Sequence, residues 1–443
     1  MELKNIKSIY FTGIKGVAMT ALALCAQDMG IKVTGSDTKE LFVTDEILKD
    51  REINWVKGFK PERITKEYDL LITTGAHGGL NNLEVLEARK LGIPVLTQAE
   101  ALGEFTRGKK VIAVCGVGGK TTTSALIAHI LDFAGMEPSY LVGVGRIYPL
   151  GVPGRFVTNS QYFVCEADEF VNSPGVDNTP KFMFLAPLVV VVTNIEYDHP
   201  DVYPSFADTL TAYQKFFQKI PKNGLLVANA RDQNAGKIIN SLKCPVVRFK
   251  IDEKVESSLP GIYNRKNIAA AIAVADYLKI PRVKTLAAVK SFIGTQRRFE
   301  KIGVTKTGVP VYDDYAHHPK ELKAVIAAAK EKFPGKRLVV VFQPHTYSRT
   351  KILMPEFSRA FNKADVVGLM DIYASAREIP DPEVSSEKLA QLVAKENPSV
   401  SYIGDHESTL KWLDKTLKKD DILMTLGAGD IFYLHQKLCT KQI

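Results

Sequence analysis

Residues 111–131, VIAVCGVGGKTTTSALIAHIL, join an apolar run, a glycine turn, a lysine with three threonines and a second apolar run. This order predicts a buried strand and then a helix whose N-terminus directs backbone N–H groups at a polyphosphate. Lys120 would reach the terminal phosphates, and the Thr121 hydroxyl would bind a magnesium ion. The same loop contains Gly116, Gly118, Gly119 and Thr122. Because Val114 stands where the strict phosphate-loop spacing requires glycine, a plain glycine turn with a solvated lysine is the alternative.

Clusters of acidic and other polar side chains follow two other predicted strands. They lie in CEADEF and TNIEYDHPD and comprise Glu166, Asp168, Glu169, Asn194, Asp198, His199 and Asp201. Such carboxylates can hold Mg²⁺ against phosphates gathered by Lys120 and Thr121. A solvated loop would explain either cluster alone, but two clusters at strand ends beside a phosphate loop favour a binding site.

The segment GIKGVAM joins the first predicted strand to the first helix and contains Gly13 and Gly16. Asp37 ends the next strand, about 20 residues further on, as in the dinucleotide-binding fingerprint. Lys15 and Ala18 stand where that fingerprint has glycine. The segment therefore predicts a phosphate-bearing ligand at the helix start, with Asp37 near a sugar hydroxyl, and a simple tight turn is the alternative.

Histidines gather at two strand ends in the last third of the chain. YDDYAHHP supplies Asp314, His317 and His318, and FQPHTYSRT supplies His345 and Arg349. A lone histidine is usually structural, but histidines with an arginine at successive strand ends indicate a carboxylate-bearing or phosphorylated ligand. Since the regular spacing of metal-binding histidines is missing, a zinc site is not predicted.

Short apolar strands alternate with helical stretches along the chain, which predicts an α/β fold of doubly wound sheets. The pattern restarts after EFTRGKK at 104–110 and at GTQRRFEK, residues 294–301. We therefore expect three domains, at residues 1–106, 107–296 and 297–443.

The composition of the 443 residues, 45% hydrophobic and 24% charged, is typical of a globular protein. The net charge of +9 comes from lysines and arginines spread along the chain, so a nucleic-acid-binding surface is not predicted. No apolar run approaches ~18 residues, and we expect no membrane insertion. The five cysteines are widely spaced and predict reduced thiols in the cytoplasm.

Together these motifs resemble those of the Mur ligases, the ATP-dependent amide-forming ligases of peptidoglycan synthesis. GVGGKTTT is similar to the family's ATP loop, EADE and TNIEYDH to its magnesium segments, GIYNRKN to its adenine segment and QRRFE to its arginine motif. DDYAHHP, QPHTYSRT and DIYASARE are similar to C-terminal signatures of the branch that adds an amino acid. The resemblance covers essentially the whole chain. It implies a Rossmann-like UDP-sugar domain, a P-loop ATPase-like central domain and a Rossmann-like C-terminal domain that closes over both ligands.

The resemblance also implies roles for individual residues. Lys120 and Thr121 would hold the ATP phosphates and the metal, and Glu166 and His199 would hold magnesium ions. The other residues expected at ATP are Gly116, Gly118, Gly119, Thr122, Asn267 at adenine, Arg298 at the phosphates, and Asp314. The UDP site would contain Gly13, Gly16 and Asp37. The muramyl carboxylate and the incoming amino acid would meet His317, His345 and Arg349.

The implied reaction joins L-alanine to the carboxylate of UDP-N-acetylmuramate in a monomer or homodimer. ATP would convert that carboxylate to an acyl phosphate, with Lys120, Arg298 and magnesium neutralising the transferring group. The neutral amine would then attack, and His199 and His317 are both candidates for the base that takes its proton.

Two alternatives remain at this point. A ligase that recycles murein peptides would share the UDP-N-acetylmuramate and ATP sites but accept an L-alanyl-led tripeptide. A nucleotide-switch protein would need only the central domain and would leave the histidine-rich third part unexplained. A nicotinamide oxidoreductase is a weaker idea, because GIKGVAM lacks the full glycine fingerprint.

Overall fold

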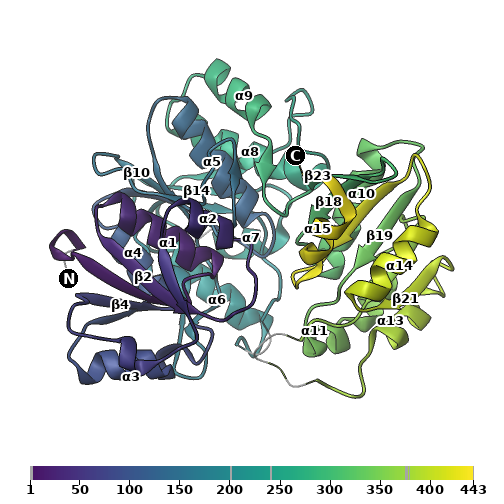
Figure 1. The fold of residues 1–443 in the computed structure, drawn as a ribbon. Helices are drawn as coiled ribbons and strands as arrows, with labels where there is room; N and C mark the ends of the chain where they lie inside the picture. The colour runs from purple at the N-terminus through teal and green to yellow at the C-terminus, as the bar shows by residue number, and fades with distance from the viewer. Residues whose placement is uncertain (1–2, 200–201, 240–241, 375–377, 379, 443) are drawn as a thin grey trace. The chain divides into compact units, whose positions relative to one another are not determined.

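The computed structural model describes residues 3–199, 202–239, 242–374, 378 and 380–442. Asp201 and residues 375–377 of DIYASARE therefore lie outside the described part of the chain. The chain packs as two compact units (Figure 1). Unit 1 comprises Met1–Ser258 and Arg265–Gln296, and unit 2 comprises Leu259–Asn264 and Arg297–Ile443.

The first sheet of unit 1 is parallel, with strand order β3-β2-β1-β4-β5. Its strands are β1 (Ser8–Thr12), β2 (Lys32–Asp37), β3 (Asn54–Lys57), β4 (Leu70–Thr73) and β5 (Val95–Thr97). Its helices are α1 (Val17–Asp28), α2 (Asp45–Asp50), α3 (Leu83–Lys90) and α4 (Gln98–Phe105). The strand order reverses between β1 and β4, and sheets of this kind bind ligands at the carboxyl ends of such strands. Gly13, after β1, packs there against Thr74, after β4.

The second sheet of unit 1 has seven strands in the order β15-β14-β13-β6-β10-β7-β9, and only β9 is antiparallel to its neighbour. Its strands are β6 (Lys110–Cys115), β7 (Ser139–Leu141), β9 (Gly154–Arg155), β10 (Tyr162–Glu166), β13 (Pro187–Val192), β14 (Leu225–Asn229) and β15 (Val246–Phe249). The associated helices are α5 (Lys120–Phe133), α6 (Phe206–Phe217), α7 (Gln233–Ile238), α8 (Ile262–Tyr277) and α9 (Arg282–Ser291). Two small ribbons pair β8 (Ile147–Tyr148) with β16 (Gly294–Thr295) and β11 (Val171–Ser173) with β12 (Asp177–Pro180). Here the strand order reverses between β6 and β13.

Unit 2 contains a seven-stranded sheet in the order β21-β20-β19-β22-β18-β17-β23. Its strands are β17 (Glu300–Thr305), β18 (Pro310–Asp314), β19 (Leu338–Phe342), β20 (Val366–Met370), β21 (Val400–Gly404), β22 (Ile422–Leu426) and β23 (Cys439–Gln442). Its helices are α10 (Pro319–Lys332), α11 (Tyr347–Ile352), α12 (Met354–Ser358), α13 (Ser386–Val393), α14 (His406–Thr416) and α15 (Leu434–Leu438). Strand β17 is antiparallel to β18 and β23, whereas the other pairs are parallel. The segments after β18, β22 and β19 are therefore neighbours at one edge of this sheet.

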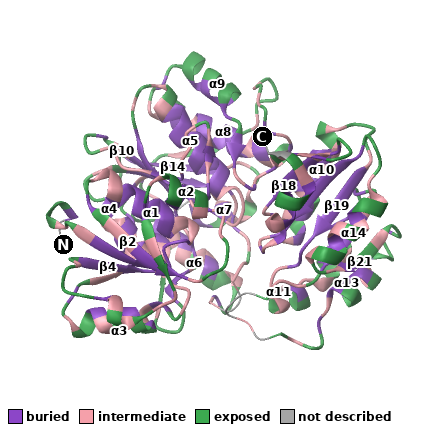
Figure 2. Ribbon diagram, viewed as in Figure 1, coloured by how far each residue is buried: buried purple, intermediate pink, exposed green. Residues whose placement is uncertain are grey.

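The strands are mostly buried in both units, whereas helices such as α9 and α14 carry many exposed residues (Figure 2). The strands β13 and β19 read PLVVVV and LVVVF, and almost all of these side chains are buried. Continuous apolar runs of this kind are what a parallel sheet covered on both faces requires. In the described chain, none of the helices has the length and apolar character needed to cross a membrane.

Candidate active site

The phosphate loop lies between β6 and α5, as the glycine and lysine pattern predicts. Gly116 and Gly119 have φ values of 120° and 89°, which side-chain-bearing residues rarely adopt. A Cβ at Gly116 would collide with Thr193 Oγ1, and one at Gly119 with Asn267 Oδ1. The loop therefore depends on glycine both for its backbone and for close packing.

Two residues after β13 fix the conformation of this loop. Asn194 Oδ1 accepts a hydrogen bond from Gly118 N at 3.0 Å, and Thr193 Oγ1 donates one to Gly118 O at 2.6 Å. Helix α5 has 14 residues and begins after Gly119, which provides no side-chain cap for its first-turn amides. Thr121 and Thr122 lie in that first turn and are buried. The positive end of the helix is thus directed at the loop, as phosphate binding requires.

Lys120 lies among carboxylates that follow β10. Its Nζ atom is 3.0 Å from Glu169 Oε2 and 3.8 Å from Asp168 Oδ1, and Lys181 Nζ is 3.0 Å from Asp168 Oδ2. Burial opposes the charge on Lys120, but Glu169 and Asp168 outweigh burial and raise the lysine pKa. The site therefore holds Lys120 as a cation beside two anions that a metal ion could share.

A trio of residues that could hold a metal ion lies next to Lys120 and comprises Glu169, Asp198 and His199, whose ligand atoms all lie within 4.8 Å of one another. His199 packs against the Phe170 ring, with centroids 4.7 Å apart. The sequence expectation paired His199 with Glu166 instead. Glu166 ends β10, and its Oε1 accepts a hydrogen bond from Gly143 N at 2.7 Å. The structure thus groups Glu169 with His199, and metal binding by Glu166 stays a prediction.

Asp37, expected near a sugar hydroxyl of the UDP site, is the last residue of β2 and is buried. Gly13 and Gly16 form the turn after β1, and Gly16 N donates to Gly13 O at 3.3 Å. Asp37 is 1% exposed, and its two carboxylate oxygens accept hydrogen bonds from Lys15 N and Thr38 N, each at 2.7 Å. The carboxylate thus closes its own loop, and its contact with a sugar hydroxyl stays a prediction.

Two residues near this turn were missed by sequence reasoning. His77 Nε2 lies 3.9 Å from Asp37 Oδ1, and its ring packs on Phe59 at 5.0 Å. The Lys15 ammonium is buried, lies 3.1 Å from Asp45 Oδ1 and stands over the Trp55 ring at 4.4 Å. The ammonium also donates to Thr38 O and Glu40 O, so Lys15, which breaks the glycine fingerprint, anchors the segment before α2.

In unit 2, the two arginines of QRRFE have different environments. Arg297 is buried, with Nε 2.8 Å from Asp313 Oδ2, and its Nη1 and Nη2 donate to the carbonyl oxygens of Gly429 and Gly427 at 3.2 and 2.6 Å. Arg298 is partly exposed, and its guanidinium lies over the Tyr315 ring at 5.2 Å. Arg297 is thus committed to the fold, whereas Arg298 remains accessible to an anion.

Asp314, expected at ATP, is almost fully buried at the end of β18. Its oxygens accept hydrogen bonds from Phe299 N and Ala316 N, both at 2.8 Å. Burial outweighs these bonds and the charge of Arg298, and it raises the pKa of Asp314 to about 6. Asp314 thus connects two segments, QRRFE through Phe299 and YDDYAHHP through Ala316. Its carboxylate is almost fully buried.

His317 has a tautomer that the geometry defines. Its Nδ1 lies 3.0 Å from Tyr315 O, and because a carbonyl can only accept, Nδ1 carries the proton. The Nε2 lone pair is then free to accept a proton in the neutral ring. Burial, aided by Arg349 and Arg298, outweighs Glu321 and lowers the pKa of His317. The neighbouring His318 caps α10 instead, accepting from Lys320 N at 3.3 Å.

His345 and Arg349 form a second group after β19. Arg349 Nη1 donates to His345 Nδ1 at 3.3 Å, and the His345 ring stacks on Tyr373 at 5.6 Å. The His317 and His345 rings are 6.1 Å apart, so the two predicted histidine segments meet. Glu378, which sequence reasoning did not single out within DIYASARE, accepts from Tyr347 N at 2.6 Å and from Ser348 N at 3.0 Å. It thereby fixes the start of α11, the helix that contains Arg349.

Three segments of the chain match described Mur ligase domains. Residues 8–110 match the Mur ligase family catalytic domain, residues 114–256 the Mur ligase middle domain, and residues 297–429 the Mur ligase glutamate ligase domain. The UDP-N-acetylmuramate–L-alanine ligase of Clostridium kluyveri is 38% identical over 469 residues, covering 98% of this chain and 99% of that protein. The chain belongs to the Mur ligase family. Membership makes this Mur ligase an ATP-dependent enzyme that forms amide bonds.

Solved structures agree with this assignment. The UDP-N-acetylmuramate–alanine ligase MurC of Thermotoga maritima superposes with a TM-score of 0.79 at 25% identity, covering 98% of each chain. A murein peptide ligase of Psychrobacter arcticus 273-4 gives a TM-score of 0.70 at 23% identity, again over 98% of each chain, and shares the fold. The predicted three-domain Mur ligase architecture is therefore confirmed.

Proposed function

We propose that this Mur ligase joins L-alanine to the carboxylate of UDP-N-acetylmuramate, with ATP converted to ADP and phosphate, in peptidoglycan synthesis. The observation that carries the proposal is the full-length likeness to a relative of that name at 38% identity. In this proposal residues 1–106 bind the UDP-sugar, residues 107–296 bind ATP and residues 297–443 bind the amino acid.

Mg²⁺ suits the donors beside the phosphate loop. Two carboxylates and an imidazole converge in Glu169, Asp198 and His199, and hard cations favour such oxygen-rich sets. In this proposal the trio binds the metal together with the Thr121 hydroxyl. A magnesium ion bound there would neutralise negative charge on the phosphoryl group.

Lys120 and Arg298 neutralise the transferring phosphoryl group during formation of the acyl phosphate. The raised pKa of Lys120 keeps it cationic throughout the neutral range. Once phosphates are bound, they replace Glu169 and Asp168 as its partners. The glycine loop and the first turn of α5 orient the phosphates through backbone N–H groups.

His317 accepts the proton of the attacking amine in this proposal. Its Nε2 atom is the acceptor that the Tyr315 contact leaves available, and burial favours the neutral ring. His199 was the other candidate, but it belongs to the group assigned to the metal.

Arg349 binds the carboxylate of the incoming L-alanine. The described residues offer it no carboxylate within ion-pair distance, and its hydrogen bond to His345 uses a single nitrogen. Its remaining N–H groups suit a bidentate pair with a carboxylate.

The proposal is tested by measuring phosphate release from ATP with UDP-N-acetylmuramate and a panel of amines. We expect turnover with L-alanine and little with an L-alanyl-led tripeptide. A preference for the tripeptide would identify a peptide-recycling ligase instead. ATP binding without amide product for any amine would favour a nucleotide switch.

A further inference from the structure

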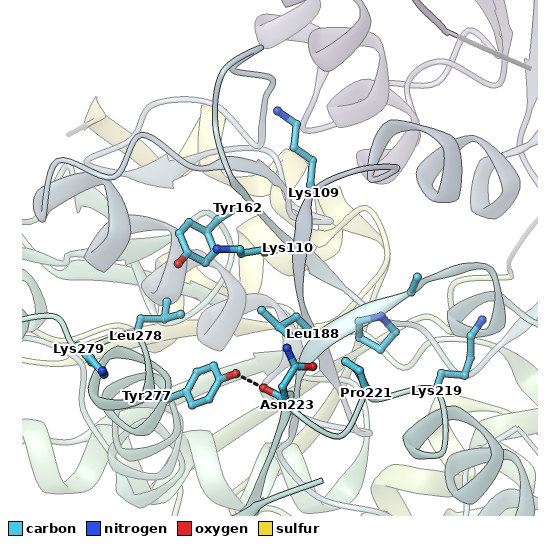
Figure 3. Close-up of a pocket in the computed structure, with 12 residues that line it drawn as sticks. Lys109, Lys110, Tyr162, Leu188, Lys219, Pro221, Asn223, Tyr277, Leu278 and Lys279 are labelled. Atoms are coloured by element: carbon cyan, nitrogen blue, oxygen red, sulfur yellow. Dashed lines mark hydrogen bonds between the residues drawn. The ribbon is translucent and has the colours of Figure 1, made fainter. Parts of the chain in front are cut away.

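A hollow of about 800 Å³ lies at the amino ends of the central strands of unit 1 (Figure 3). Lys110 begins β6, Tyr162 begins β10 and Pro187 begins β13. The phosphate loop follows the opposite end of β6. Because a strand rises about 3.3 Å per residue, the six residues of β6 separate the hollow from that loop by roughly 20 Å. The hollow is therefore distinct from the ATP site.

The charge around this hollow is of one sign. Lys109, Lys110, Lys219 and Lys279 line it, and no acidic residue is among the twelve described residues that do. None of the four lysines has a carboxylate within ion-pair distance in the described chain, whereas Lys290 on α9 lies 2.7 Å from Glu256. An uncompensated group of cations attracts an anion.

The four lysines are not equivalent. Lys109 Nζ donates to the carbonyl oxygens of Thr158 and Ser160 at 2.8 and 2.7 Å, and Lys219 Nζ donates to Met183 O. Burial lowers the pKa of both of these lysines. Lys110 and Lys279 are exposed, and Lys110 Nζ has only the neutral Gln161 Oε1 at 3.0 Å and the Tyr162 ring at 5.5 Å as described partners. These two cations are the ones available to a ligand.

The walls of the hollow are aromatic and aliphatic. Tyr162 and Tyr277 present their rings from β10 and from the end of α8, with Leu188 and Leu278 between them (Figure 3). The Tyr277 hydroxyl donates to Asn223 O at 2.8 Å, which fixes that ring. A flat apolar body could stack on such rings while a charged group met the lysines.

We propose that this hollow is a second binding site, for a planar organic anion of mononucleotide size, with Lys110 and Lys279 contacting the anionic group and Tyr162 and Tyr277 contacting the planar ring. Its volume lies within the about 300–1,000 Å³ usual for small-molecule sites. An inorganic anion would use the cations but leave the aromatic walls in water. A neutral aromatic would leave the cations without a partner.

The test is calorimetric titration of the full chain with guanosine 5′-monophosphate as the probe. We expect Lys110→Glu with Lys279→Glu to weaken binding at least tenfold and to leave ligation of L-alanine unchanged. Tyr162→Leu should also weaken binding, because it removes a ring but no charge. Lys290→Glu is the matched control, since it reverses a lysine on the same unit that already has a carboxylate partner, and it should bind like the wild type.

Four outcomes would overturn the proposal. These are no binding to the wild type at millimolar probe, equal binding to the Lys110→Glu, Lys279→Glu variant, equal weakening by Lys290→Glu, or binding of inorganic phosphate as tight as that of the nucleotide. The last would show that the aromatic walls take no part.

Discussion

One glutamate of CEADEF ends β10, and the other lies beyond the strand. Glu166 is the last residue of that strand and accepts a hydrogen bond from Gly143 N, while Glu169, three residues later, lies beside Lys120 and His199. The residue types predict an acidic metal site, but spacing alone does not choose between two glutamates in one motif. Glu169 is the glutamate that the structure places near Asp198 and His199.

Substitution of these glutamates separates the two assignments. We expect Glu169→Gln to raise the magnesium concentration needed for half-maximal turnover by tenfold or more, because it removes a ligand from a hard cation. Glu166→Gln is the matched control and should shift that concentration far less. Initial rates measured against magnesium would settle the matter, and the reverse order of effects would restore Glu166 as the ligand.

His317→Asn tests the proposed base. The asparagine amide can still donate to Tyr315 O but lacks the Nε2 acceptor, so we expect turnover to fall by about 10²–10⁴, as for loss of a general base, with little change in the Michaelis constant for ATP. The lowered pKa keeps His317 neutral at pH 7, so wild-type turnover should fall only as the pH drops below the ordinary histidine range. His318→Asn, which preserves a helix cap, should keep both turnover and pH profile. An unchanged acidic limb in His317→Asn would exclude His317 as the base.

Arg349→Lys tests the site for the incoming amino acid. A lysine keeps the charge but cannot form the bidentate pair. We expect the Michaelis constant for L-alanine to rise about ten- to hundredfold, or about 1.5–3 kcal/mol, with those for ATP and UDP-N-acetylmuramate nearly unchanged. The measurement is initial rate against L-alanine at saturating ATP and UDP-N-acetylmuramate. A uniform rise in all three constants would place Arg349 in a structural role.

In unit 2, one side chain from the segment just before β17 contacts both β18 and the segment after β22. Arg297 contacts Asp313 at the end of β18 and the carbonyls of Gly427 and Gly429 after β22. The φ values of Arg297 and Phe299 are 60° and 49°. The backbone therefore turns on either side of Arg298. The buried arginine therefore positions the exposed one.

Arg297→Met should destabilise unit 2 strongly, because it leaves Asp313 buried without its main cationic partner. Breaking such a pair from one side costs about 3–5 kcal/mol. Arg298→Met is the control and should cost less than about 1 kcal/mol, because that side chain is partly exposed. Urea unfolding followed by circular dichroism would measure both, and equal losses would contradict the division of roles.

The elements were largely predictable, whereas the partners of buried polar groups were not. Apolar runs such as PLVVVV predicted central strands, and the glycine turns at Gly13 and Gly119 predicted loop positions, because both signals are local. Asp37 was expected at a sugar but satisfies the amides of its own loop, and Lys15 was an oddity in the fingerprint but anchors the segment before α2. Glu84 on α3 likewise accepts hydrogen bonds from Tyr10 on β1 and Ser36 on β2. Burial of this kind is set by segments distant in sequence, so no local pattern reports it.

The molecule as a whole contains three family domains but two compact units. One apolar core runs through both sheets of unit 1, from Phe11 on β1 to Phe163 on β10 and Phe216 on α6. Unit 2 has its own cores, one of which contains Val340 and Phe357. Because one core spans both sheets of unit 1, we expect the N-terminal and central domains to unfold together and unit 2, which has cores of its own, to unfold as a separate transition.

The pH dependence of that second transition should report on Asp314. Its pKa of about 6 in the folded protein lies above the ordinary 3.8, so the folded state holds a proton that the unfolded state has released between these pH values. The contribution of Asp314 is therefore fully present below about pH 4 and is lost as the pH rises through 6, by about 3 kcal/mol in total. Asp314→Asn cannot titrate, so the unfolding free energy of unit 2 should fall less between pH 4 and pH 7 in the variant than in the wild type. Calorimetry at several pH values would measure this difference, and Asp420→Asn, at an exposed position, should follow the wild type. Parallel curves for Asp314→Asn and the wild type would mean that Asp314 ionises normally inside the fold, and its two backbone hydrogen bonds would then outweigh its burial.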